Sequence, residues 1–168
     1  MTIGNFSIAF VSLLFLSLVL GGCSGKGDVS EESKEATNNE KTIRDFLQAY
    51  NSADAETAIS FFADDAVWED MALGQIFEGK KEITDFFNVA HADFSDLKWE
   101  LKSIFSANNK AAFESVLSGI HTHSSFPEIP VAGKYIELKA ATIVEFRDGK
   151  ISRFADYYDL PQFEQQQD

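Results

Sequence analysis

The alternation of apolar and polar side chains between Tyr135 and Phe146 constrains the fold of this chain more than any other feature. Because successive side chains of a β-strand point to opposite faces of its sheet, this period predicts a strand with one buried face and one partly wet face. Arg147-Asp148-Gly149-Lys150 follows, and Asp-Gly is a strong signal for a hairpin turn. The chain therefore contains antiparallel strands whose apolar face must be covered. The even, mostly apolar positions are Ile136, Leu138, Ala140, Thr142, Val144 and Phe146.

Three helices and two short strands are expected ahead of this sheet. The helices are indicated by apolar residues that recur every three or four positions, and the short strands by compact apolar runs. We expect helices at 43–50, at 54–62 with a start near Asp54, and at 83–89, and short strands at 66–68 and 75–77.

The remaining elements complete an α+β fold, because helices come first and long hairpin-connected strands follow, which gathers the helices on one face of the sheet. A turn is predicted at Asn108-Asn109, and a loop bracketed by Pro127 and Pro130. The further strands are expected at 97–103, 111–121 and 151–158, followed by a polar tail at 162–168.

The N-terminus carries an apolar run from Phe6 to Leu20. A membrane-spanning helix needs about 20 apolar residues, whereas a signal-peptide core needs about 7–15. The run ends in Leu20-Gly21-Gly22-Cys23, which resembles the lipobox of bacterial lipoproteins and contains the only Cys of the chain. This resemblance implies cleavage before Cys23, acylation of Cys23 by chains such as palmitate, and membrane attachment through them. An uncleaved membrane anchor is the alternative.

We therefore divide the chain into a signal peptide at 1–22, an acidic flexible tether at 23–40 and one domain at 41–165. The tether is expected because residues 25–40 are polar and carry no large apolar residue except Val29. The mature protein is expected outside the cytoplasm on the cell envelope. Ser24 after the Cys would, by the same resemblance, imply the outer membrane in a Gram-negative cell.

The net charge of −13 argues against two kinds of partner. Nucleic-acid affinity depends mostly on Lys and Arg side chains that neutralise phosphates, and the sequence has no basic stripe, so no nucleic-acid partner is expected. The same sign disfavours adsorption to anionic headgroups, so membrane attachment is expected through lipidated Cys23 alone.

Motifs within the domain resemble the SnoaL-like branch of the nuclear transport factor 2-like superfamily. The resemblance spans roughly 41–165, and the stretch at 119–134 is similar to SnoaL-like ester cyclases. The segments that carry it are Phe62-Ala63-Asp64-Asp65-Ala66-Val67-Trp68-Glu69-Asp70, Phe77-Glu78-Gly79, Gly119-Ile120-His121-Thr122, Phe126-Pro127-Glu128-Ile129-Pro130, Gly133-Lys134 and Asp148-Gly149-Lys150-Ile151.

This resemblance implies a strongly curved, mixed or antiparallel sheet packed on three N-terminal helices, forming a cone with an apolar pocket at its open end. The 16 Phe residues suit such a pocket, so a small hydrophobic ligand is expected. Relatives often dimerise, which implies a homodimer; no cofactor is implied. The expected ligand-binding residues are Phe46, Tyr50, Trp68, Phe87, Trp99, His121, Thr142, Phe154 and Tyr158.

Two carboxylates are catalytic candidates by the same resemblance. Asp70 matches the general base of ketosteroid isomerases, but Phe46 and Ala141 or Thr142 replace the Tyr and protonated Asp of their oxyanion hole. Asp156 resembles the last-strand Asp of limonene epoxide hydrolases, although 113–117 lacks their Arg-x-Asp partner. SnoaL-like cyclases also use a late-strand Asp, assisted by a His.

His121 and His123 lie on one face of a predicted strand, but no third metal ligand accompanies them and His91 is on a distant helix, so no metal site is expected. Three functions stay open. They are a lipid-anchored binding module for a small hydrophobic molecule, an enzyme of cyclase, isomerase or hydrolase type that uses Asp70 or Asp156, and a dimeric structural domain.

Overall fold

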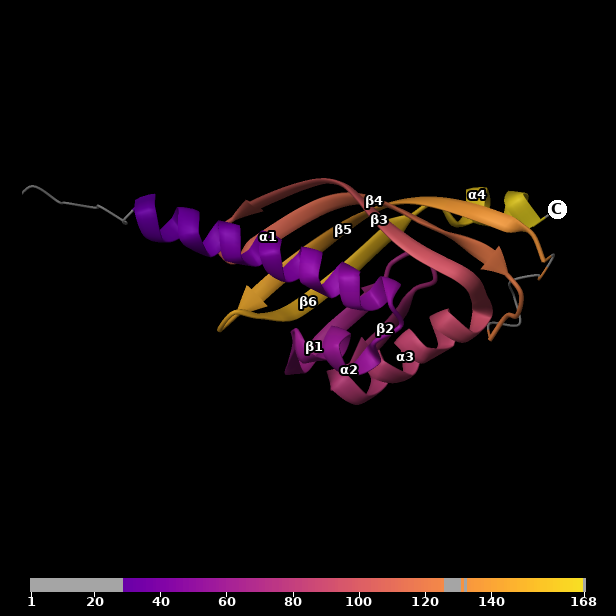
Figure 1. Cartoon of the computed structure of the whole chain (residues 1–168), viewed down its shortest axis with the longest axis horizontal. Helices are drawn as coiled ribbons and strands as arrows, with labels where there is room; N and C mark the ends of the chain where they lie inside the picture. Colours follow the sequence, from indigo (N-terminus) through magenta and orange to yellow (C-terminus); the bar gives the residue numbers. More distant parts are fainter. Residues whose placement is uncertain (1–28, 126–130, 132, 168) are drawn as a thin grey trace, which may run out of the picture.

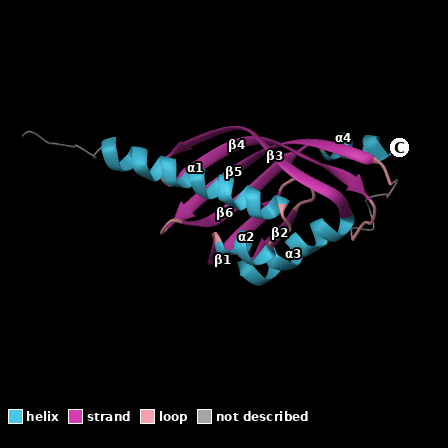
Figure 2. Cartoon of the chain, in the orientation of Figure 1, coloured by secondary structure: helices cyan, strands magenta, loops and turns pink. Residues whose placement is uncertain are grey.

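The computed structural model describes residues 29–125, 131 and 133–167. Figure 1 shows a curved sheet that wraps around the N-terminal helices, and Figure 2 shows these helices lying together on its inner side. The helices are α1 (Val29–Asn51), α2 (Ala55–Ser60), α3 (Gly79–Asp93) and α4 (Leu160–Gln167). The strands are β1 (Phe62–Asp70), β2 (Gln75–Glu78), β3 (Phe94–Ala107), β4 (Lys110–His121), β5 (Tyr135–Arg147) and β6 (Lys150–Tyr158).

The six strands form one mixed sheet in the order β2-β1-β6-β5-β4-β3. The β1–β6 pair is parallel, and the other four pairs are antiparallel. The sheet is not closed, because β2 and β3 form its two edges. This arrangement confirms the predicted α+β class and the curved mixed sheet packed on three N-terminal helices.

The alternation that predicted β5 sets which face meets the core. Ile136, Thr142 and Val144 are fully buried, whereas the odd positions between them are mostly exposed. Helical spacing turns Ile43, Phe46 and Tyr50 of α1 toward the same interior. Asp54 begins α2 as expected, because its side chain accepts the backbone N–H of Thr57 and caps the first turn.

Most of the predicted elements extend further than expected, and in three places the structure changes the type of element. Helix α1 begins at Val29, so residues 29–40 are helical and not a flexible tether. Helix-forming Glu, Lys and Ala residues favour this extension, and buried Asn39 ties it to the domain by donating to the carbonyl of Asn108 at 2.9 Å. Phe62 begins β1 rather than ending the second helix. The predicted polar tail contains α4, because the apolar side chain of Phe163 is buried against β5.

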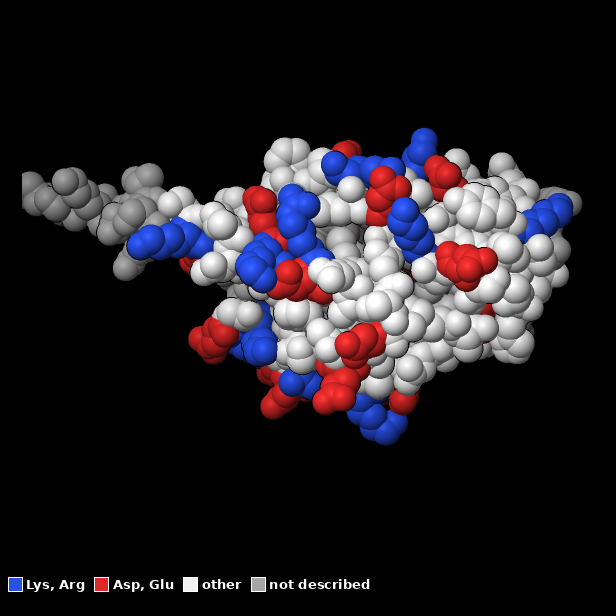
Figure 3. Space-filling view, in the orientation of Figure 1, with Lys and Arg blue, Asp and Glu red and all other residues white. Residues whose placement is uncertain are grey.

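Other predictions fall outside the described residues. These are the signal peptide at 1–22, the lipidated Cys23, and Pro127 and Pro130 of the predicted loop. Within the described part of the chain, no helix combines the length and apolar character needed to cross a membrane. On the face drawn in Figure 3, basic and acidic side chains are interspersed, so this face carries no basic stripe.

Candidate functional site

A cavity of about 110 Å³ lies toward one end of the interior, and residues of two hydrophobic clusters contribute to its wall. The larger cluster contains the aromatic residues of α1 and β1 together with Trp99 of β3, and the smaller one is built from Ile136, Leu138 and Phe163. Leu117 packs against both clusters and also lines the cavity. The cavity therefore occupies a place where the two parts of the core do not fill the space between them.

Asp156 is a buried acid at the cavity wall, with 7% of its surface exposed. Thr142 on the neighbouring strand donates its hydroxyl to Oδ1 at 2.6 Å, and the indole N–H of Trp68 donates to Oδ2 at 2.9 Å. Burial raises the pKa of Asp156 to about 7, and the nearby Asp70 carboxylate acts in the same direction. Asp156 can therefore gain or lose a proton near neutral pH.

Asp70 lies beside Asp156 because the two residues are partners across the parallel β1–β6 pair. Its Oδ1 accepts the backbone N–H groups of Ala72 and Leu73, so the carboxylate also shapes the turn that ends β1. The hydroxyl of Tyr158 donates to its Oδ2 at 3.0 Å. Burial raises the pKa of Asp70 in spite of these bonds, which lower it.

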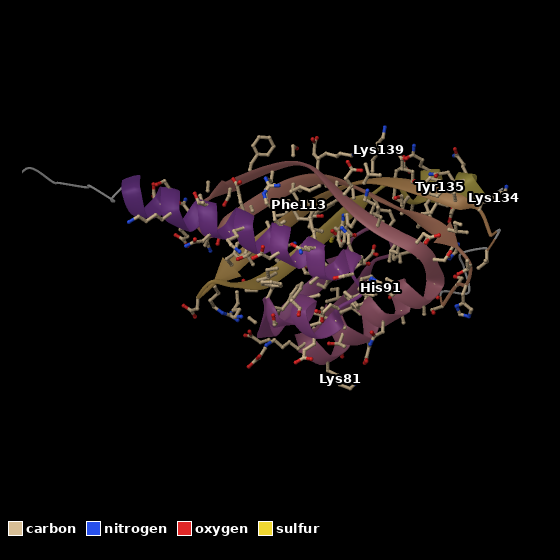
Figure 4. The ribbon with its side chains drawn as sticks, in the orientation of Figure 1. Lys81, His91, Phe113, Lys134, Tyr135 and Lys139 are labelled. Atoms are coloured by element: carbon tan, nitrogen blue, oxygen red, sulfur yellow. The ribbon has the colours of Figure 1, made fainter. Side chains whose placement is uncertain are left out.

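Two phenols add to the polar part of the wall. Burial is the main cause that raises the pKa of Tyr50 and Tyr158, and both therefore stay protonated and able to donate. Tyr50 is held by His91 of α3, whose Nε2 lies 2.9 Å from the Tyr50 carbonyl and whose ring is 4.7 Å from the phenol ring. Figure 4 labels His91 at this junction of α3 with the end of α1.

The opposite wall joins the end of α3 to the segment after β4. Buried Asp93 accepts a hydrogen bond from Nδ1 of His123 at 2.8 Å. It also accepts hydrogen bonds from the hydroxyl of Ser125 at 2.9 Å and from the backbone N–H of Ser125 at 2.8 Å. His121 is buried and stacks on Phe94, with ring centroids 4.8 Å apart. Asp93, Phe94 and His121 line the cavity, whereas His123 lies at its outer side with an exposed ring.

The structure brings seven of the predicted site residues to the cavity: Tyr50, Trp68, Asp70, Trp99, His121, Asp156 and Tyr158. Phe46, Phe87 and Phe154 are instead packed inside the larger cluster, because their strand and helix positions point to its centre. Thr142 is buried behind Asp156 and positions it. Within the described residues, no three His, Cys, Asp or Glu side chains form a metal site.

Sequence reasoning missed the other lining residues. Those on α3 could have been found, because their positions follow the helical period of one face. Phe163 could not, since its short helix lies in a polar segment. The missed residues are Leu73, Phe86, Val89, Ala90, Asp93, Phe94, Leu117, Ser124, Leu138, Ala140 and Phe163.

The model of the SnoaL-like domain matches residues 43–154 of this chain. Among solved structures, a protein assigned as a SnoaL-like polyketide cyclase from a Jannaschia species superposes with a TM-score of 0.70 at 16% identity, covering 78% of this chain and 92% of that one. A protein assigned as a polyketide cyclase from a Silicibacter species superposes with a TM-score of 0.68 at 24% identity. The match covers 77% of this chain and 95% of that one.

A third solved structure is a ketosteroid isomerase-like protein from Catenulispora acidiphila in complex with trimethylamine. It superposes with a TM-score of 0.66 at 19% identity and covers 75% of this chain and 91% of that one. At these identities the three structures establish a shared fold.

Proposed function

Because the chain belongs to the SnoaL-like domain family, we propose that it binds a small, mostly apolar organic molecule whose polar group meets Asp156. The main support for this proposal is the cavity. Its wall is aromatic or aliphatic except where the carboxyl groups, phenols and a few other polar side chains converge. Small-molecule sites commonly combine an apolar surface with a few placed polar groups. The size suits a small ligand, since an engineered cavity of about 150 Å³ holds benzene.

Cyclohexanone is a suitable probe, because it combines an apolar ring with one carbonyl that protonated Asp156 or a phenol can hydrogen-bond. Its addition should shift the NMR signal of the Trp68 indole N–H, which bonds to Asp156. Ala140→Leu should abolish the shift by filling the cavity. Ala141→Leu on the exposed face of the same strand is the matched control and should leave the shift intact. Equal responses in the two variants would contradict pocket binding.

A second candidate is an enzyme of cyclase or isomerase type in which Asp156 transfers a proton, and the near-neutral pKa of this buried group favours it. The position of Phe46 lacks the expected Tyr donor, but Tyr50 lies one helical turn later and brings a phenol to the wall. If an activity is found, Asp156→Asn should lower kcat by about 100-fold or more while Asp148→Asn in an exposed turn leaves it unchanged. Unaltered turnover in Asp156→Asn would exclude this role.

We further propose that the chain is exported and lipid-anchored through Cys23, as the lipobox resemblance implies. Labelling of growing cells with an alkyne analogue of palmitate should mark the protein, and Cys23→Ala should abolish both the label and its recovery with membranes. Persistence of the label in that variant would contradict the assignment.

We also propose that two copies of the chain form a homodimer through the outer face of the sheet. Ile143 and Tyr157 are each 39% exposed there, on neighbouring strands. Light scattering of the full chain should give twice the protomer mass, and Ile143→Glu should reduce it to one protomer. A monomeric parent protein would overturn this part.

A further inference from the structure

We propose that the molecule held in this cavity is a small organic cation with a methylated nitrogen, such as a tertiary or quaternary amine. The inference rests on the proposed small-molecule binding and names the class of ligand for that same site.

The wall carries acidic groups. Asp70, Asp93 and Asp156 line the cavity, and among the residues that the structure describes no Lys or Arg lines it. All three carboxyl groups are at least 93% buried, so water screens them weakly. A cation placed between the carboxyl groups would relieve the repulsion between Asp70 and Asp156, whereas an anionic ligand would add to it.

The rest of the wall is built largely from aromatic faces. Trp68, Trp99 and Tyr50 adjoin one another, with ring centroids of Trp99 lying 6.1 Å from Trp68 and 5.0 Å from Tyr50. Phe86 lies 5.3 Å from Trp68, and Phe94 and Phe163 are on the opposite side with centroids 6.4 Å apart. Aromatic faces attract cations through their quadrupole, most strongly when the cation is desolvated and the ring is Trp.

The hydrogen bonding of the carboxyl groups favours a methylated nitrogen over a primary ammonium. Both oxygens of Asp156 and both oxygens of Asp70 already accept hydrogen bonds from this chain. A primary ammonium needs acceptors for three N–H groups, whereas a quaternary ammonium needs none and presents only methyl groups to the wall. The volume of about 110 Å³ also suits a compact headgroup.

The test compares tetramethylammonium with tert-butanol, which is neutral and has the same number of heavy atoms. Binding to the full-length protein is followed through the Trp68 indole N–H signal at pH 8. Tetramethylammonium should bind at least about tenfold more tightly than tert-butanol, because only the cation gains from the carboxyl groups and the rings.

Two pairs of variants separate the contributions. Asp156→Asn should weaken the binding of tetramethylammonium far more than that of tert-butanol and so remove most of the preference for the cation. Asp148→Asn, an equal change in charge on the exposed turn, should preserve the preference. Phe86→Leu should weaken the cation more than the alcohol, because it keeps an apolar side chain and removes a ring, whereas Phe86→Tyr should not.

The outcomes distinguish this inference from the proposed function. Equal or weaker binding of tetramethylammonium than of tert-butanol overturns the cation inference and leaves small-molecule binding standing. A cyclohexanone response without any tetramethylammonium binding has the same meaning. Failure of all three probes in a folded protein overturns both.

Discussion

The two ends of the interior are built on the same strands but differ in the side chains that these strands place there. At one end, Phe62 of β1 and Phe154 of β6 meet Phe46 of α1, with ring centroids 5.5 and 5.3 Å from that ring. At the other end, the same two strands present Asp70 and Asp156, which border the cavity. The length of β1 and a two-residue step along β6 therefore separate a filled aromatic core from an acid-lined hollow.

This difference shows how stability and function are divided within one domain. The filled end makes the dense contacts between aromatic rings that stabilise folded proteins. The hollow end keeps carboxyl groups buried at a cost, which a domain tolerates at a site of function. Substitutions at the two ends should therefore have different, and in one case opposite, effects on stability.

The largest expected effect contrasts one Phe→Ala change at each end. Phe154→Ala should lower the free energy of unfolding by about 3–5 kcal/mol, because the cavity it leaves lies inside a fully packed cluster. Phe163→Ala should cost about 1–2 kcal/mol, since its space joins an existing cavity and its short helix is near the end of the chain. Urea denaturation measures both. Equal losses would mean that the two ends are packed alike.

The second prediction concerns Asp156, whose substitution should raise the free energy of unfolding instead of lowering it. Its pKa is about 7 in the folded protein and 3.8 in the unfolded chain, so the folded state holds the proton more tightly. The stability contributed by this group is complete below about pH 4 and is lost as the pH rises to about 7. Asp156→Asn should therefore stabilise the protein at pH 8 by on the order of a few kcal/mol and flatten its pH dependence.

Asn fits this position because Thr142 can accept its N–H while Trp68 donates to its oxygen. Asp148→Asn on the exposed turn is the control and should leave the pH dependence unchanged. A lower stability of Asp156→Asn at pH 8 would show that the ionised carboxylate is a stabilising part of the hollow end.

A smaller effect is expected from the hydroxyl that supports the ionised Asp156. Thr142→Val keeps the shape of the side chain and removes the 2.6 Å bond to Oδ1. A hydrogen bond to a charged group contributes about 1.5–3 kcal/mol, so the pKa of Asp156 should rise by about one to two units. An NMR titration of the carboxyl carbon measures it. Thr84→Val on α3 is the matched control, and a pKa that falls or stays would refute the role of Thr142.

The smallest predicted effect lies at the edge of the hollow end. The Gln166 amide accepts the N–H of Glu137 at 2.8 Å and donates to its carbonyl at 3.1 Å, which holds α4 on β5. Gln166→Ala should cost about 1 kcal/mol or less and speed hydrogen exchange of the Glu137 amide. Gln165→Ala, at an exposed neighbouring position, should change neither. Unaltered exchange in Gln166→Ala would show that packing of Phe163 alone holds α4.

Sequence patterns determined much of this protein. The period of β5 and the spacing of Ile43, Phe46 and Tyr50 predicted which faces are buried, because the geometry of a strand or helix fixes the direction of each side chain. The SnoaL-like motifs pointed to Asp70 and Asp156 and to most of the aromatic residues at the cavity wall. The helical start of α1 at Val29 was missed, since a polar segment gives no period to read.

Tertiary structure alone decided how these groups combine. The parallel pairing of β1 with β6 places Asp70 beside Asp156, and the register of β5 places Thr142 behind it. No local sequence pattern predicts these pairings. The period of a strand determines which side chains share a face, but it does not determine which strands lie beside it. The volume left between the two clusters depends on how helices and sheet pack together. The burial that raises the pKa of Asp156 depends on the same packing.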